Sequence, residues 1–261
     1  MQSKKTALIT GASSGIGYEL ARVFARNGYD LVLVARSEQQ LVQLADELKA
    51  TYGSEVVVMK KDLSLSTAPG EIVAELEQRV IAIDALVNNA GVGAFGMFTE
   101  LDLDTQLRMM QVNMVTLTHL TRLLLPPMLE RRSGKILNVA STAAFQPGPL
   151  MTVYYATKAY VLSFSEGLVN ELQGSGVSVT ALCPGPTASG FQKRAVMEDS
   201  RLVQGGLMSA QAVAEIGYRA LMKNQAIVIP GLRNRVMALS VRVTPRAIVR
   251  RFVRRIQERL H

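Results

Sequence analysis

The sequence predicts an α/β fold, in which a doubly wound parallel sheet of about seven strands carries helices on both faces. Short apolar runs alternate with helix-periodic stretches through most of the chain. The apolar residues of each run are consecutive rather than alternating, as in strands that are covered on both faces. A glycine-rich turn joins the first apolar run to the first helical stretch, as is common in such sheets.

The elements can be assigned in order along the chain. We expect right-handed crossovers between parallel strands. The segment from Pro184 to about Ser209 is the least regular and carries three glycines, so it is predicted to be a mobile lid. The expected strands are residues 6–10, 31–35, 56–60, 85–88, 135–139, 177–183 and 226–229, and the expected helices lie near 15–28, 38–51, 69–80, 104–131, 153–173 and 209–223.

Composition narrows the class of protein. The 261 residues are 48% hydrophobic, which suits one large domain, here residues 1–231. The single cysteine, Cys183, excludes a disulfide framework, lies in an apolar run that predicts a buried thiol, and fits a cytoplasmic setting. Residues 1–5 leave no room for a signal peptide, and no apolar run is long enough for a membrane span. Two histidines make a metal site improbable.

The net charge of +8 lies entirely in the tail. Residues 1–231 balance 20 basic against 20 acidic side chains, whereas residues 232–261 hold nine arginines and one acid, Glu258. This distribution argues against a general nucleic-acid-binding surface. It indicates an arginine-rich C-terminal helical extension, with Thr244 as N-cap and Pro245 as first helical residue.

The predicted tail helix is amphipathic. Its apolar face consists of Ile248, Val249, Phe252, Val253, Ile256 and Leu260, and arginines cover the rest. Three occupants of that face stay open: the domain itself or a second subunit, an anionic membrane surface reached through residues 245–260, or an acidic partner.

The glycine-rich turn runs from Thr10 to Gly17. Glycines there allow close approach of a pyrophosphate, and the following helix N-terminus offers unpaired N–H groups. A plain loop is the alternative, because a glycine-bearing turn is frequent. The candidate cofactor-binding residues of this turn are Gly11, Ser13, Ser14, Gly15, Ile16 and Gly17.

Residues that follow the strands should line any ligand site. Where an acid often holds an NAD ribose, this chain has Ala35 followed by Arg36 and Ser37, which favours NADP(H) over NAD(H); the alternative is a solvated arginine at a helix start. Asp62, followed by Leu63, could accept from adenine or cap a helix. Asn89, Ala90 and Gly91 would admit a ribose or form an ordinary turn.

A tyrosine and a lysine stand near the start of the predicted helix 153–173. Tyr154 and Tyr155 lie four and three residues before Lys158, so either could share its helix face. Ser141 follows the fifth strand, and Pro184-Gly185 follows the sixth. Tyr154 as a core aromatic and Lys158 as a surface charge remain the alternative.

Together these motifs are similar to those of the short-chain dehydrogenase/reductase family, over roughly residues 5–230. The resemblance implies a Rossmann-type fold and an oxidoreductase that acts on CH–OH or C=O groups. Many NADP-preferring members carry a basic residue in the glycine turn, where this chain has Ser13 and Ser14, so the preference for NADP(H) rests mainly on Arg36, with Ser13 and Ser37 as further phosphate donors. The resemblance also implies a homodimer or homotetramer. It assigns catalysis to Asn113, Ser141, Tyr154 and Lys158, and adds cofactor contacts from Tyr154, Lys158, Pro184, Gly185 and Thr187, with Ser189 as a further hydroxyl candidate.

The chemistry suits carbonyl reduction. Lys158 should lower the pKa of the Tyr154 phenol, Ser141 should hold the substrate oxygen, and Asn113 should hold a water that returns the proton. An apolar ketone or aldehyde is the expected substrate, because the segments 93–97, 143–151 and 187–191 offer Phe95, Met97, Phe145, Met151 and Phe191. The alternatives are a 3-oxoacyl-thioester reductase and a non-catalytic NADP(H)-sensing protein.

Overall fold

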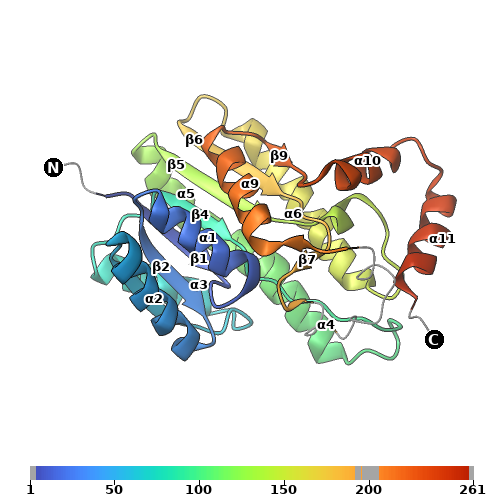
Figure 1. Ribbon diagram of the computed structural model, residues 1–261, viewed down its shortest axis with the longest axis horizontal. Helices are drawn as coiled ribbons and strands as arrows, with labels where there is room; N and C mark the ends of the chain where they lie inside the picture. The colour runs from blue at the N-terminus through green and yellow to red at the C-terminus, as the bar shows by residue number, and fades with distance from the viewer. Residues whose placement is uncertain (1–3, 192–194, 196–205, 259–261) are drawn as a thin grey trace.

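The sheet is a seven-stranded parallel sheet in the order β3-β2-β1-β4-β5-β6-β9 (Figure 1). It is seen in a computed structural model that describes residues 4–191, 195 and 206–258. The strand order reverses between β1 and β4, where ligands of such sheets bind. The strands are β1 (Thr6–Thr10), β2 (Asp30–Ala35), β3 (Val56–Lys60), β4 (Ala85–Asn88), β5 (Gly134–Val139), β6 (Val177–Leu182) and β9 (Ile227–Val228).

The predicted fold class is confirmed, and every predicted strand of the sheet lies within two residues of an observed one. The reason is burial on both faces: Leu8 and Ile9 of β1, which point to opposite faces, are both fully buried. An apolar run that neither face exposes is easy to find in a sequence.

Helices cover both faces. Phe24 of α1 (Gly15–Arg26), Leu44 of α2 (Glu38–Tyr52) and Val213 of α9 (Ala210–Met222) belong to one buried cluster. Ile72 of α3 (Ala68–Gln78) and Leu120 of α5 (Leu117–Glu130) belong to a second cluster, on the opposite face. The long helix α6 (Thr152–Glu171) also covers this second face through its partly buried residues near Leu168. The doubly wound arrangement follows directly.

The prediction of a single helix over residues 104–131 is wrong in one respect. The chain forms α4 (Leu103–Met110), a π-helical turn over Gln111–Thr116, and then α5. A π turn widens the helix by one residue and is often found at functional sites. Here it is held by tertiary contacts of Asn113, which no helical periodicity could reveal.

The segment after β6 carries two short strands, β7 (Thr187–Ala188) and β8 (Met208–Ser209), which pair in parallel. Half of the expected lid, residues 192–194 and 196–205, lies outside the described residues. The described residues contain no helix that is long and apolar enough to cross a membrane.

The C-terminal extension forms two helices, α10 (Leu232–Ser240) and α11 (Arg246–Gln257), at the edge of the molecule farthest from the N-terminus (Figure 1). The sequence did not indicate α10. The predicted cap of the second helix is wrong by one residue: Pro245 is the N-cap, because its backbone is extended. Thr244 instead donates its hydroxyl hydrogen to the Ser240 carbonyl at 2.8 Å. Leu260 lies outside the described residues.

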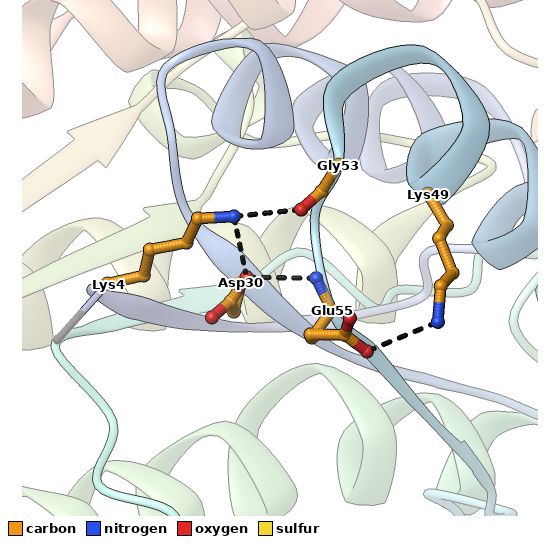
Figure 2. Close-up of polar contacts among 5 residues, drawn as sticks. All are labelled: Lys4, Asp30, Lys49, Gly53 and Glu55. Carbon is orange, nitrogen blue, oxygen red and sulfur yellow. Dashed lines mark hydrogen bonds and ion pairs between the residues drawn. The ribbon is translucent and has the colours of Figure 1, made fainter.

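Charged side chains connect neighbouring segments at one corner of the sheet, at the end opposite the site (Figure 2). Lys4 Nζ donates to the Gly53 carbonyl at 2.8 Å and lies 3.8 Å from the Asp30 carboxylate. That carboxylate also accepts from the backbone N–H of Glu55 at 2.9 Å. These contacts tie the start of β2 to the turn between α2 and β3.

Candidate active site

A cavity of about 460 Å³ opens at the carboxyl ends of the strands. It extends from the ends of β2 and β3 to the start of α6, across the point where the strand order reverses. Of the predicted site residues it is lined by Gly11, Ser13, Ser14, Gly15, Ile16, Arg36, Ser37, Asp62, Leu63, Asn89, Ala90, Gly91, Ser141, Tyr154, Lys158, Pro184, Gly185 and Thr187. Only Gly17 and Asn113 stand behind the lining.

The glycine turn is packed too tightly for larger residues. Gly11 and Gly15 have φ angles of +66° and +59°, in the region that favours glycine. A Cβ on Gly17 would come within 2.3 Å of the Gly11 carbonyl oxygen. Gly17 therefore lets α1 pack on the turn, which brings the helix N-terminus to the cavity. Unpaired N–H groups and the helix dipole at that end fit a pyrophosphate.

The cavity end near β2 and β3 is basic. Exposed Arg36 lines it together with Ser37, Lys61 and Arg108. Asp62 lies among them. Burial opposes ionisation of Asp62, but hydrogen bonds from Ser64 and the nearby Arg36 and Arg108 hold the pKa of the carboxyl below its usual range. Asp62 does not cap α3, whose N-cap is Thr67, so the capping alternative is wrong.

The turn after β4 is fixed by Asn89, whose amide donates to the Thr10 carbonyl at 2.8 Å. This contact ties the end of β4 to the glycine turn across the sheet. Gly91 faces Lys158: a Cβ there would lie 3.4 Å from Nζ. Small residues at this turn therefore keep the space in front of the lysine open.

Three candidate catalytic residues meet at the other end of the cavity. Lys158 Nζ donates to the Val139 carbonyl at 2.8 Å and lies 5.8 Å from the centre of the Tyr154 ring. Ser141 accepts from the backbone N–H of Ala143 at 3.1 Å, donates to the Pro184 carbonyl at 3.4 Å, and lies close enough to Tyr154 to lower the pKa of its phenol. One helical turn of α6 and the end of β5 thus bring the phenol, the ammonium and the hydroxyl together.

The electrostatics of this group differ from the sequence-based expectation. Burial raises the pKa of the Tyr154 phenol, although the Ser141 hydrogen bond lowers it, and although the residue as a whole keeps some exposure to the cavity. Burial lowers the pKa of Lys158 to about 8. Desolvation therefore outweighs the attraction expected between phenolate and ammonium. Both groups favour their neutral forms more than free side chains do.

Asn113 stands in the π turn and is 1% exposed. Its amide group accepts from the Val92 backbone N–H at 2.9 Å, and donates to the Val92 carbonyl at 2.9 Å and to Thr157 Oγ1 at 3.0 Å. Thr157 directly precedes Lys158. The side chain therefore ties the turn after β4 to α6 immediately beside the lysine.

Tyr155, the alternative to Tyr154, faces a different neighbour. Its hydroxyl accepts from Gln257 Nε2 of α11 at 2.5 Å. Burial raises its pKa to about 12, and hydrogen bonds with Gln257 and Gln146 lower it. Tyr155 shares a buried cluster with Val249 and Val253 of α11. It therefore anchors the C-terminal helix, while Tyr154 lies beside Ser141 and Lys158.

The apolar wall of the cavity is only partly the expected one. Met151 and Phe191 line it, and the Phe191 ring lies 5.2 Å from that of Tyr154. Phe95, Met97 and Phe145 do not line it. Phe145 packs against a separate cluster, and Met97 is 44% exposed. The sequence did not indicate the lining residues Gln40, Lys61, Ser64, Arg108 and Met237, whereas the lining residue Gln146 lies within the expected segment 143–151.

The Pro184-Gly185 turn explains how Met237 reaches the site. A Cβ on Gly185 would lie 2.5 Å from the Asn234 side chain of α10. The Asn234 amide donates to the Pro230 carbonyl at 2.7 Å, which fixes its position over the turn. Close packing of α10 on Gly185 brings Met237 to the cavity wall. Thr187, on the same turn, donates to the Gly185 carbonyl at 2.9 Å.

Two further expectations concern groups away from the cavity wall. Cys183 is fully buried, as expected for a structural thiol, and burial raises its pKa to about 12. In the part of the chain that the structure describes, no three His, Cys, Asp or Glu side chains stand close enough to hold a metal ion.

The fold and the cavity are those of a nucleotide-binding α/β protein, with Tyr154 and Lys158 at one end of the cavity. Residues 5–199 match the family described as short chain dehydrogenase. The chain therefore belongs to the short-chain dehydrogenase family, whose oxidoreductases act on CH–OH and C=O groups.

Curated relatives include a short chain dehydrogenase of Pseudocercospora fijiensis, 39% identical over 71% of this chain and 60% of the relative. The ketoacyl reductase HetN of a Nostoc species is 36% identical over 69% of this chain and 63% of the relative. A very-long-chain 3-oxoacyl-CoA reductase of Anas platyrhynchos is 38% identical over 72% of this chain and 61% of the relative. The matches thus span about three fifths of these relatives' lengths.

Solved structures are similar over nearly the whole chain. A short-chain dehydrogenase from Sphingobium yanoikuyae in complex with NADPH is 34% identical, with a TM-score of 0.82 over 90% of this chain and 92% of that one. A bulky-bulky ketone specific alcohol dehydrogenase from Comamonas testosteroni is 31% identical, with a TM-score of 0.78 over 90% of each chain. A relative from Burkholderia phymatum in complex with NAD is 28% identical, with a TM-score of 0.80 over 92% of each chain.

Proposed function

We propose that the protein is an NADP(H)-dependent oxidoreductase that interconverts an apolar ketone or aldehyde and its alcohol. The observation that carries the proposal is the meeting of Ser141, Tyr154 and Lys158 at one end of a cavity whose other end is basic. Between them lie the glycine turn and the N-terminus of α1, which fit a pyrophosphate. Family membership supports the same reading.

When bound, the nicotinamide supplies the hydride that the carbonyl carbon accepts. Tyr154 gives its proton to the carbonyl oxygen, and Ser141 donates a hydrogen bond to that oxygen as its negative charge develops. Lys158 stabilises the resulting phenolate, because its ammonium lies beside the ring. Asn113 holds Val92 and Thr157 beside Lys158, and we propose that it also holds the water that returns the proton.

The preference for NADP(H) rests on Arg36. Ala35 occupies the position where an acid would hold an NAD ribose, Arg36 follows it, and Ser13 and Ser37 line the same cavity. A guanidinium forms strong hydrogen bonds with a phosphate. The similar structures include complexes with NADPH and with NAD, so the cofactor needs a direct test.

The substitution Arg36→Ala provides this test. It should raise the KM for NADPH by about tenfold, the size of one lost charge-assisted hydrogen bond, and leave the KM for NADH nearly unchanged. An equal effect on both cofactors would contradict a role for Arg36 in binding the 2′-phosphate.

An apolar substrate is supported by Met151 and Phe191, which pack with Tyr154, and by Met237, which lines the same cavity. A 3-oxoacyl thioester is the second candidate, because two curated relatives carry the names of a ketoacyl reductase and a very-long-chain 3-oxoacyl-CoA reductase.

A homodimer or homotetramer is supported by large apolar side chains exposed on α4, such as Leu103 and Leu107.

The decisive assay measures NADPH oxidation with ketones, aldehydes and 3-oxoacyl thioesters in one panel. Turnover of simple apolar ketones or aldehydes supports the first proposal. A preference for acyl thioesters by two orders of magnitude or so in kcat/KM favours the second. Tight NADPH binding without turnover of any member would favour a cofactor-sensing protein.

A further inference from the structure

The outer surface of α10 and α11 combines exposed large apolar side chains with a high density of arginines. Along α10, Leu232, Val236 and Leu239 are 79%, 59% and 47% exposed, and their spacing puts them on one stripe of the helix. Val243, in the connection to α11, is 86% exposed. Large apolar side chains that are this exposed, and that lie close together along the chain, indicate a surface that contacts a partner or a membrane.

The apolar face of α11 is only half used by the domain. Val249 and Val253 are buried against the cluster that contains Tyr155, and Gln257 continues the buried edge with a bond to the Tyr155 hydroxyl. Ile248 and Phe252, on the neighbouring edge of the same face, are 56% and 58% exposed. Docking on the domain therefore fixes α11 and presents its second apolar edge outward.

Arginines flank both stripes. On the helical wheel Arg251 and Arg255 stand beside Ile248 and Phe252, and both are exposed. Residues 232–258 hold eight arginines, and Glu258 is their one acidic residue. That carboxylate lies 3.4 Å from Arg254, so it neutralises one charge of the set.

We propose that this surface, formed by the outward faces of α10 and α11, binds an anionic lipid membrane peripherally. Exposed apolar side chains would enter the boundary between headgroups and acyl chains, and the arginines would contact lipid phosphates. The proposal is independent of which substrate the cavity takes.

Charge argues against a second copy of the chain as the occupant. Two copies related by a twofold axis would bring the same arginine-rich surfaces together, and like charges across an interface repel. An anionic bilayer meets both requirements of the surface, because it offers negative charge and an apolar layer.

The test is flotation of the full chain with phosphatidylcholine vesicles, with and without phosphatidylglycerol, at low and high salt. We expect flotation with the anionic vesicles only, and weaker flotation at high salt. Absence of flotation with anionic vesicles at low salt would overturn the proposal. So would concentration-dependent self-association that the variants below abolish, because the surface would then bind a second copy.

Two double variants test the two parts of the surface. Arg251→Glu with Arg255→Glu, and Ile248→Ser with Phe252→Ser, should each weaken anionic-vesicle binding by about tenfold or more. The matched controls are Lys49→Glu with Lys223→Glu, and Val42→Ser with Leu65→Ser, which make the same changes at exposed sites of the remaining domain. Equal losses in variants and controls would contradict a specific surface, and thermal melting checks that each variant is folded.

Discussion

Basic side chains are found both in the cavity at the carboxyl ends of the strands and on the surface of α10 and α11, but their surroundings differ. Lys158 is 5% exposed, donates to the Val139 carbonyl at 2.8 Å, and has its pKa lowered by burial. The arginines of α11, such as Arg251 and Arg255, are exposed and lie beside exposed apolar residues. The chemistry proposed for the cavity depends on the position of single atoms, whereas the membrane binding proposed for the surface is a sum of small contributions. Single substitutions should therefore have large effects in the first region and small effects in the second.

The largest effect is expected at Tyr154. Tyr154→Phe removes the proton donor and should lower kcat by about a hundredfold to ten-thousandfold, while NADPH binding, followed by fluorescence, stays intact. Tyr155→Phe is the matched control, because its hydroxyl contacts Gln257 rather than the reacting end. If the two variants lost activity equally, the distinction between the neighbouring tyrosines would be wrong.

Burial of Lys158 should appear in the pH dependence of stability. Its pKa is about 8 in the folded protein against an ordinary value of 10.5, so between these values the unfolded chain binds more protons. The stability contributed by this residue is therefore lost as pH falls toward 8 and is restored as pH rises toward 10.5. As the pH rises through this window, the free energy of unfolding of the wild-type protein should increase by about 3 kcal/mol relative to that of Lys158→Met.

Urea denaturation of both proteins at several pH values measures this difference. A free energy of unfolding that changes with pH in the same way in wild type and Lys158→Met would mean that the lysine is not desolvated.

Packing of the glycine turn gives a smaller effect. Gly17→Ala places a Cβ against the Gly11 carbonyl and should lower the free energy of unfolding by about 1–3 kcal/mol, as overpacking does. Gly167→Ala, at a helical position of α6 with open space around it, should instead raise it by about 1 kcal/mol. Thermal or urea unfolding measures whether each variant is less or more stable than the wild type. If both Gly17→Ala and Gly167→Ala were destabilised, close packing at Gly17 would not explain its effect.

The smallest effects are expected in α11, and they divide the helix into two edges. Val253→Ala removes buried methyl groups and should lower the free energy of unfolding by about 1–2 kcal/mol. Phe252→Ala, next to it on the exposed edge, should change it by no more than about 0.5 kcal/mol. Comparable losses in urea denaturation would show that Phe252 is covered by the protein itself.

The same contrast explains what the sequence could predict. Strand positions follow from runs such as Ala7–Ile9, because burial on both faces leaves a continuous apolar signal. The cavity residues were found because they follow strands or sit at the start of a helix. The π turn was missed, since it depends on Asn113 contacts with Val92 and Thr157, which lie far away in the sequence.

The C-terminal pair was only partly predictable for a related reason. The strong amphipathic pattern of α11 indicated a helix, but not which edge of its apolar face would be buried. The apolar stripe of α10 faces outward, whereas its inward contacts are made by Asn234 against Gly185 and by the small residue Ala238, so the apolar pattern does not point to the domain. The position of Met237 in the cavity wall could therefore not be predicted from the sequence.

The central claim is that Tyr154 stands at the hydride-transfer end of a dinucleotide site. Single-turnover reduction of an apolar ketone by NADPH deuterated at the transferring position of its nicotinamide ring tests this most directly. The account predicts that the deuterium moves to the carbinol carbon of the product. Failure of the protein to bind NADPH, or an alcohol product without deuterium at that carbon, would contradict it.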